Sequence, residues 1–147
     1  MGTDIHVHVL KREKDNTFTE LKVFDNEGND VTWRMPYNDR NYDRFGVLAG
    51  LRVAGAQPIV PLRGLFWGLP QNIINEFNKG WYHSPTWFDY VELEALAKTP
   101  EAIVEWDDDD KYNVLDGFVG SISTLLQLYG IYSPYPGEII VFMMFDS

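Results

Sequence analysis

Polar and apolar residues alternate along the first dozen positions of the chain. Because successive side chains of a strand point to opposite faces, the alternation predicts a strand over residues 3–11. The alternating positions are Ile5, Val7 and Val9 on the apolar side and Asp4, His6 and His8 on the polar side. A carboxylate and two imidazoles in one row are an uncommon use of a strand, so we take this row as the floor of a candidate site.

The same kind of pattern predicts further elements along the chain. Alternation over 17–24 after a turn-like stretch predicts a hairpin with the first strand, and the Asn-, Asp- and Gly-rich residues 25–40 predict a long loop. Apolar residues at helical spacing predict helices over 41–52, 71–79, 87–98 and 113–129. The third helix follows a Ser-Pro-Thr start signal at 84–86, and the fourth ends before Gly130.

The chain closes with a nearly continuous apolar run over residues 138–145. Such a run is typical of a strand buried on both faces, so we expect it at the centre of a sheet, beside the N-terminal strand. The sequence contains no internal repeat and no linker-like segment. It therefore predicts a single α+β domain over residues 1–147. Its small, mainly antiparallel sheet has central N- and C-terminal strands and is packed by three to four helices.

Composition narrows the classes of function. The formal net charge is −10, and an acidic surface repels a phosphate backbone, which argues against binding a nucleic-acid polymer. The lack of cysteine excludes disulfides, zinc knuckles and thiol nucleophiles. Apolar runs are too short for a membrane span and the first residues lack a secretory pattern, so we expect no membrane association and a cytoplasmic location.

Several polar residues outside the predicted core suit ligand binding, although each has a structural alternative. An Asp with two His on one strand face suits zinc, manganese or iron, but the same groups also form ordinary hydrogen-bonded pairs. Arg40, at a predicted helix start, is either a surface cation or a phosphate ligand. Trp87 is either packing or a wall for stacking on a base. Ser84 follows His83 directly, and adjacency alone does not aim a hydroxyl at an imidazole, so we do not expect a serine hydrolase.

Four consecutive aspartates occupy residues 107–110. A calcium loop of the helix–loop–helix kind needs oxygen ligands at alternate positions, a mid-loop Gly and a late Glu, which this run lacks. We therefore interpret it as a solvated turn, with Asn113 capping the following helix.

The order of short motifs resembles that of a family of small, uncharacterised phage and prophage proteins. The motifs are M-G-x-D-I-H at residues 1–6, R-N-Y-x-x-F-x-x-L-A-G-x-R at 40–52, R-G-L at 63–65, G-L-P at 68–70, H-S-x-[ST]-W-x-x-x-x-E-L at 83–93 and F-D at 145–146. His8 falls outside that pattern, and the segment 66–67 resembles an insertion. The resemblance implies a small cytoplasmic accessory protein outside the virion, of a kind that often counters host defence systems that signal with nucleotides.

That resemblance leads to a first hypothesis, a protein that sequesters a small nucleotide-derived signalling molecule without a cofactor. Guanidinium groups would hold its phosphates, aromatic rings would stack on the base, and Asp4 or Asn41 would bind ribose or the base edge. The candidate ligand-binding residues are Asp4, His6, Arg40, Asn41, Tyr42, Arg52, Arg63, His83, Ser84 and Trp87. The hypothesis predicts that arginines and histidines converge on one pocket; self-association into a homo-oligomer stays open.

Two alternatives belong to other functional classes. The first is a metal-dependent phosphohydrolase in which Asp4, His6 and His83 hold zinc or manganese and activate water. The second is an acidic inhibitor that presents residues 107–110 to a host enzyme.

Overall fold

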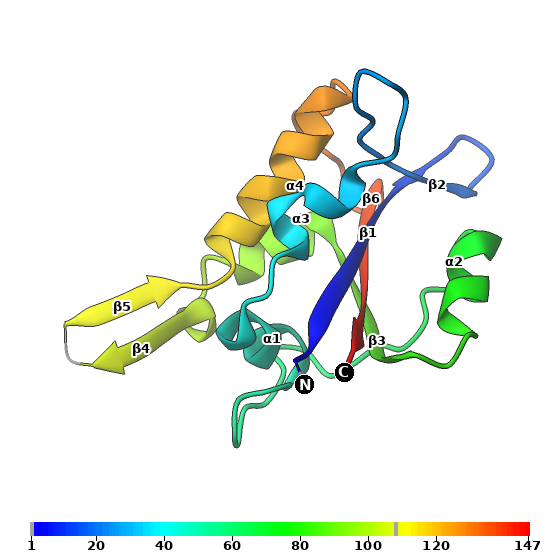
Figure 1. Cartoon of the computed structure of the whole chain (residues 1–147). Helices are drawn as coiled ribbons and strands as arrows, with labels where there is room; N and C mark the ends of the chain where they lie inside the picture. The colour runs from blue at the N-terminus through cyan, green and yellow to red at the C-terminus, as the bar shows by residue number, and fades with distance from the viewer. Residues whose placement is uncertain (1, 108) are drawn as a thin grey trace.

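A four-stranded antiparallel sheet forms the centre of the protein (Figure 1). Its strands follow the order β2–β1–β6–β3. Their bounds are β1 (Asp4–Arg12), β2 (Phe18–Glu20), β3 (Tyr82–Asp89) and β6 (Ile139–Asp146). The computed structural model describes residues 2–107 and 109–147; Met1 of the first motif and Asp108 of the acidic run lie outside the described residues.

The two terminal strands lie side by side, as predicted. β1 pairs with β6 from Asp4 opposite Asp146 to Lys11 opposite Ile139. β6 is buried from Ile139 to Phe145, because its alternating residues enter two different cores on the two faces of the sheet. The central position of this strand and the α+β class are thereby confirmed.

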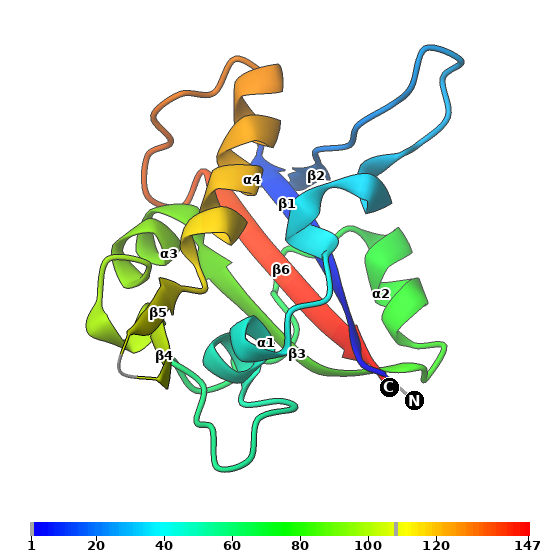
Figure 2. The same cartoon turned by 60° about the vertical axis from the view of Figure 1, so that its left-hand side comes forward.

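One face of the sheet carries the larger core. It is covered by α1 (Tyr42–Ala49), α3 (Tyr90–Leu96), α4 (Asp116–Leu128) and the short 3-10 helices η1 (Thr32–Arg34) and η2 (Pro36–Asn38) (Figure 2). Ile5 and Val9 of β1 pack there against residues such as Phe45 and Phe118. We call this side the core face.

The opposite face is covered only in part, by α2 (Gln71–Phe77) and the loop before it. Leu10 of β1 and Phe142 of β6 are buried there against Phe66 and Ile73. On β1, Leu10 belongs to this smaller apolar cluster, whereas the earlier residues on the same face, His8, His6 and Asp4, are polar. We call this side the α2 face.

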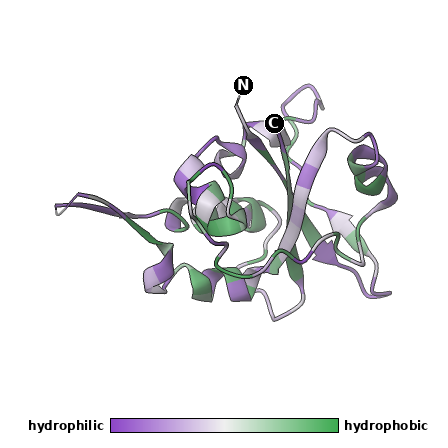
Figure 3. Cartoon of the chain, turned by 90° about the horizontal axis from the view of Figure 1, so that it is seen from below, coloured by the Kyte–Doolittle hydropathy of each residue, from purple (hydrophilic) through white to green (hydrophobic). Residues whose placement is uncertain are grey.

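A two-stranded hairpin projects from the main body (Figures 1 and 3). It consists of β4 (Ile103–Asp107), which follows the 3-10 helix η3 (Pro100–Ala102), and β5 (Asp110–Asn113). None of the helices in the described part of the chain has the length and apolarity to cross a membrane.

The prediction of a helix over 87–98 was wrong at its start. Residues 82–89 form β3, and the helix begins only at Tyr90, with the Asp89 carboxylate accepting the Val91 N–H at 3.0 Å. Pro85 lies at a bulge on an edge strand, where the lack of a backbone N–H removes no ladder bond. The start signal therefore marked a strand irregularity rather than a helix cap.

Three other elements have bounds that differ from the predicted ones. The first long helix ends at Ala49 because Gly50 takes a left-handed conformation with φ of 71°. The second strand is only three residues long. The last helix begins at Asp116 with Leu115 as its N-cap, and Asn113 lies before it, where it accepts the N–H groups of Leu115 and Asp116.

Candidate functional site

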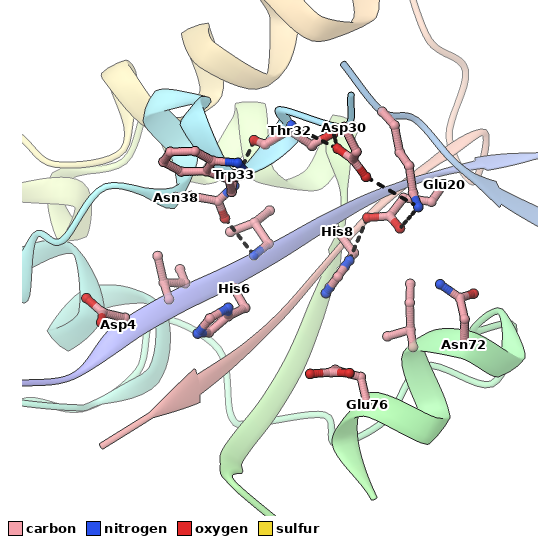
Figure 4. A pocket seen from close by; sticks show the side chains of 14 residues that line it. Asp4, His6, His8, Glu20, Asp30, Thr32, Trp33, Asn38, Asn72 and Glu76 are labelled. Carbon is pink, nitrogen blue, oxygen red and sulfur yellow. Dashed lines mark hydrogen bonds and ion pairs between the residues drawn. The ribbon is translucent and has the colours of Figure 1, made fainter. Parts of the chain in front are cut away.

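A hollow of about 560 Å³ lies along the outer edge of β1 (Figure 4). β2 pairs only with residues 10–12 of β1, so the first half of this edge has no neighbouring strand. One wall is α2, and the other comes from the segment between Glu20 and Asn38. The volume lies within the usual range for small-molecule sites, and many of the lining groups are polar or charged.

His6 forms the first polar pair of the floor. Its Nε2 lies 2.6 Å from Oδ2 of Asp146, the residue that ends β6. The second oxygen of Asp146 accepts the backbone N–H of Asp4 at 3.3 Å, and the Tyr82 ring packs edge-on against the imidazole. A carboxylate and a ring thus hold the imidazole in one orientation.

His8 forms a second pair, two residues along the same strand. Its Nδ1 lies 2.6 Å from Oε2 of Glu20 on β2. Lys22 Nζ stands between Glu20, at 3.9 Å, and Asp30, at 3.6 Å. His8 and Glu20 are both well shielded from solvent, so this network is the more enclosed end of the hollow.

The α2 wall contributes Asn72 and Glu76, which are one helical turn apart and point toward β1 (Figure 4). Lys79 donates to Glu76 at 2.8 Å and the Tyr82 hydroxyl donates at 3.1 Å. The bond from Lys79 is the largest cause that lowers the pKa of Glu76, and the bond from Tyr82 lowers it further. The carboxylate therefore remains ionised.

The opposite wall is ordered by Asp30 and Thr32. The Thr32 hydroxyl donates to Asp30 at 2.6 Å, and this bond is the largest of the causes that lower the pKa of Asp30. Asn38 accepts the Val7 N–H of β1 at 2.9 Å. Trp33 is 69% exposed, and the Arg34 guanidinium lies 5.1 Å from its ring centroid.

Only part of the predicted site lines this hollow. Asp4 and His6 do, and Arg40 reaches its rim by donating to Asp4 at 2.9 Å. The predicted residues that do not line it are Asn41, Tyr42, Arg52, Arg63, His83, Ser84 and Trp87.

Arg40 and Arg52 both place their guanidinium groups over the ring of Tyr42. Their guanidinium carbons lie 5.9 Å and 4.7 Å from the centroid of its ring, and the Tyr42 hydroxyl accepts the Thr3 N–H. Arg52 lies beyond the end of α1 with φ of 65°, a strained value for a residue with a side chain. The Arg40 guanidinium also packs so closely on Gly2 that any Cβ there would collide with it.

Two predicted ligands have structural roles. Asn41 is the N-cap of α1 and accepts the Arg44 N–H at 3.0 Å. Arg63 binds Glu92 through two bonds of 2.7 Å and 2.6 Å, donates to the Trp87 carbonyl and stacks over the Trp87 ring. These side chains are engaged within the fold.

His83 and His6 lie on opposite faces of the sheet. Cross-strand partners share a face, and His83 is opposite Phe145, a core-face residue, whereas His6 is opposite Met144 on the α2 face. The two histidines therefore do not converge, and the residues that we expected in one pocket are divided between the two faces of the sheet.

A bulge in β3 gives Ser84 a positive φ of 53°, which brings its hydroxyl within 2.9 Å of His83 Nδ1. The other ring nitrogen lies 2.8 Å from the Ser147 hydroxyl. In the part of the chain that the structure describes, no three His, Asp or Glu side chains are grouped to hold a metal ion. The structure does not bring Asp4, His6 and His83 together, because His83 lies on the core face and His6 on the α2 face.

Most of the lining residues outside the predicted ligand set come from other segments. His8 belongs to the polar row of the first strand but was not among the predicted ligand-binding residues. Asn72 and Glu76 share a helical face at i and i+4, a signal that was present but not used. The predicted hairpin of 17–24 with the first strand brings Glu20 near this row without fixing its register. Asp30 reaches the row through tertiary packing, which the sequence does not show.

Comparisons with protein-family models, with curated proteins and with solved structures find no match for this chain. Its likeness to phage accessory proteins therefore remains a prediction from short motifs.

Proposed function

We propose that this protein captures a small nucleotide-derived molecule in the hollow beside β1. One observation carries the proposal: a space of about 560 Å³ whose floor holds two imidazole–carboxylate pairs in fixed orientations. Fixed polar groups in a hollow of this size recognise a small molecule by its hydrogen-bonding pattern. The adjacent Trp33 supplies an exposed ring for stacking on a base.

The rim near Asp4 supports a place for phosphate. Arg40 contacts Asp4, which lines the hollow, and shares the Tyr42 ring with Arg52. Among the described residues, no carboxylate lies within ion-pair distance of the exposed Arg52 guanidinium. Two guanidinium groups at one end of a polar hollow suit a ligand with a nucleoside part and a phosphate part.

The biological setting in this proposal rests on the motif resemblance alone. We propose that the protein acts in the host cytoplasm as a phage accessory protein and removes a signalling nucleotide used in defence. Capture without turnover is favoured over metal-dependent hydrolysis because the ligands required for hydrolysis are divided between the two faces of the sheet.

The direct test is to heat the purified protein and identify released molecules by mass spectrometry. Binding of ADP-ribose and of cyclic dinucleotides is then measured by calorimetry for the wild type, His6→Ala and His83→Ala. We expect an intact nucleotide, at least a tenfold affinity loss for His6→Ala and a change below twofold for His83→Ala, the matched histidine outside the hollow. Equal losses in both variants, or conversion of the nucleotide to products, would refute the proposal.

A second candidate, an acidic inhibitor of a host enzyme, is favoured by the projecting hairpin. Asp107, Asp109 and Asp110 of this hairpin are exposed. A cell-based assay of anti-defence activity would separate the candidates. Activity lost when the three aspartates become lysine, but kept in His6→Ala, would support inhibition by the hairpin over ligand capture.

A further inference from the structure

We infer that the hollow selects its ligand by hydrogen-bond donors, so that amino and hydroxyl groups enter it and phosphates remain outside. This inference rests on the proposed function and names the part of the molecule that is recognised. It follows from the direction of each polar group on the hollow, taken in turn.

The carboxylates set the tautomers of the two histidines. An ionised carboxylate only accepts hydrogen bonds, so the imidazole nitrogen beside it must carry the proton. His6 therefore donates from Nε2 to Asp146, and His8 donates from Nδ1 to Glu20. When such a ring is neutral, its other nitrogen is left as an acceptor. For His8 this second nitrogen is on the side of the ring turned away from Glu20, toward the α2 wall (Figure 4).

The walls add more acceptors than donors. Of the described residues that line the hollow, four are carboxylates and one is a lysine. Asp30 and Glu76 have lowered pKa values and stay ionised, which keeps them as acceptors. The lysine, Lys22, already faces Glu20 and Asp30, so its charge is largely balanced before a ligand arrives.

A phosphoryl oxygen is anionic and only accepts hydrogen bonds, so it meets repulsion inside this hollow. An exocyclic amine and the hydroxyls of ribose donate hydrogen bonds and match the free imidazole nitrogens and carboxylates. Arg40, which is ion-paired with Asp4, provides a cation at the rim, outside the residues that line the hollow. The hollow therefore suits an amino-bearing nucleoside, with any phosphate held at the rim.

The test compares pairs of probes that differ in a single donor group. Calorimetry measures adenosine against purine riboside, which lacks the amino group, and against 2′,3′-dideoxyadenosine, which lacks the hydroxyls. We expect each analogue to bind at least tenfold more weakly than adenosine. ATP should differ from AMP by less than threefold, since the added phosphates stay outside. Equal binding of the analogues, or a tenfold preference for ATP over AMP, would overturn the inference.

A second readout examines the tautomers themselves. Nitrogen-15 chemical shifts of the histidine rings should show a proton on Nε2 of His6 and on Nδ1 of His8. Glu20→Ala removes the acceptor of His8 and should lower adenosine affinity at least fivefold, whereas Glu105→Ala on the exposed hairpin serves as the matched control with no change. The opposite tautomers in the wild type would refute the donor-selective floor even if nucleotides bind.

Spermidine separates this inference from the function it rests on. It carries donors and positive charge but no base, ribose or phosphate. Binding of spermidine without binding of any nucleoside probe would support the donor-selective hollow and refute the nucleotide ligand. No binding of either kind of donor would refute both.

Discussion

The two faces of β1 have opposite chemistry although they share one backbone. On the core face Ile5, Val7 and Val9 are each at most 4% exposed and pack against helices. On the α2 face His6 and His8 of the same strand are paired with carboxylates and border an open hollow. The core face is covered along its full length and stabilises the fold, whereas the α2 face is covered at one end and leaves polar side chains beside a hollow. The difference lies in how far α2 extends over the sheet.

Ile5→Ala should give the largest effect on folding. The Ile5 side chain is 2% exposed and belongs to the larger core, so its removal leaves a cavity beside β6. We expect the free energy of unfolding to fall by about 2–5 kcal/mol. Urea denaturation followed by tryptophan fluorescence measures it. A loss below about 1 kcal/mol would mean that the helices pack less tightly on β1 than its burial indicates.

Arg63→Ala should have an intermediate effect on stability and none on ligand affinity. The side chain makes two short bonds to Glu92 and one to the Trp87 carbonyl, and the pKa of Arg63 is raised chiefly by its bonding to Glu92. We expect a loss of about 1–2 kcal/mol, and only partial recovery with Arg63→Lys because lysine lacks the two-pronged geometry. The same denaturation series, run with calorimetry, checks both parts. A tenfold loss of affinity in Arg63→Ala would instead show that Arg63 contacts the ligand, as the sequence analysis predicted.

These two residues show which parts of the molecule were predictable. The alternation at Ile5 and the apolar run of β6 are local patterns with one physical cause, burial of a face, so both strands and their pairing were predicted correctly. Local patterns also located α4 and the Asn113 side chain that accepts N–H groups at its start. The role of Arg63 was not predictable, because the sequence alone does not show whether a guanidinium binds a carboxylate such as Glu92 or a phosphate.

The strand β3 and half of the hollow were missed for a related reason. Residues 82–89 become a strand by pairing with β6 about sixty positions later, and that partnership outweighs the local helix signal at Pro85. Likewise Glu20 meets His8 only through the β1–β2 hairpin register, and Glu76 arrives on a separate helix. Side chains that converge through tertiary contacts leave no spacing to read in a single sequence.

His6→Ala should have a smaller effect on folding than its neighbour Ile5. The imidazole side chain is 37% exposed, and its partner Asp146 is 35% exposed, so the carboxylate can turn to water when the imidazole is removed. We expect the free energy of unfolding to change by less than about 1 kcal/mol. Paired denaturation curves of the two variants measure the contrast directly. A loss as large as that of Ile5→Ala would show that the floor of the hollow is part of the structural core.

Tyr37→Phe should have the smallest effect and the opposite sign. Tyr37 is fully buried on the core face, and its hydroxyl has no hydrogen-bond partner among the described residues. Burial also raises the pKa of this hydroxyl, as expected for a group kept from water. His6 and His8 on the α2 face are paired with carboxylates, whereas the Tyr37 hydroxyl on the core face has no partner among the described residues. Removing an unpaired buried group relieves a desolvation cost. We expect a gain of about 0.5 kcal/mol in the free energy of unfolding, since the ring that fills the space is retained. A loss of about 1 kcal/mol or more would reveal a partner for the hydroxyl, and with it a polar element within the apolar side of the sheet.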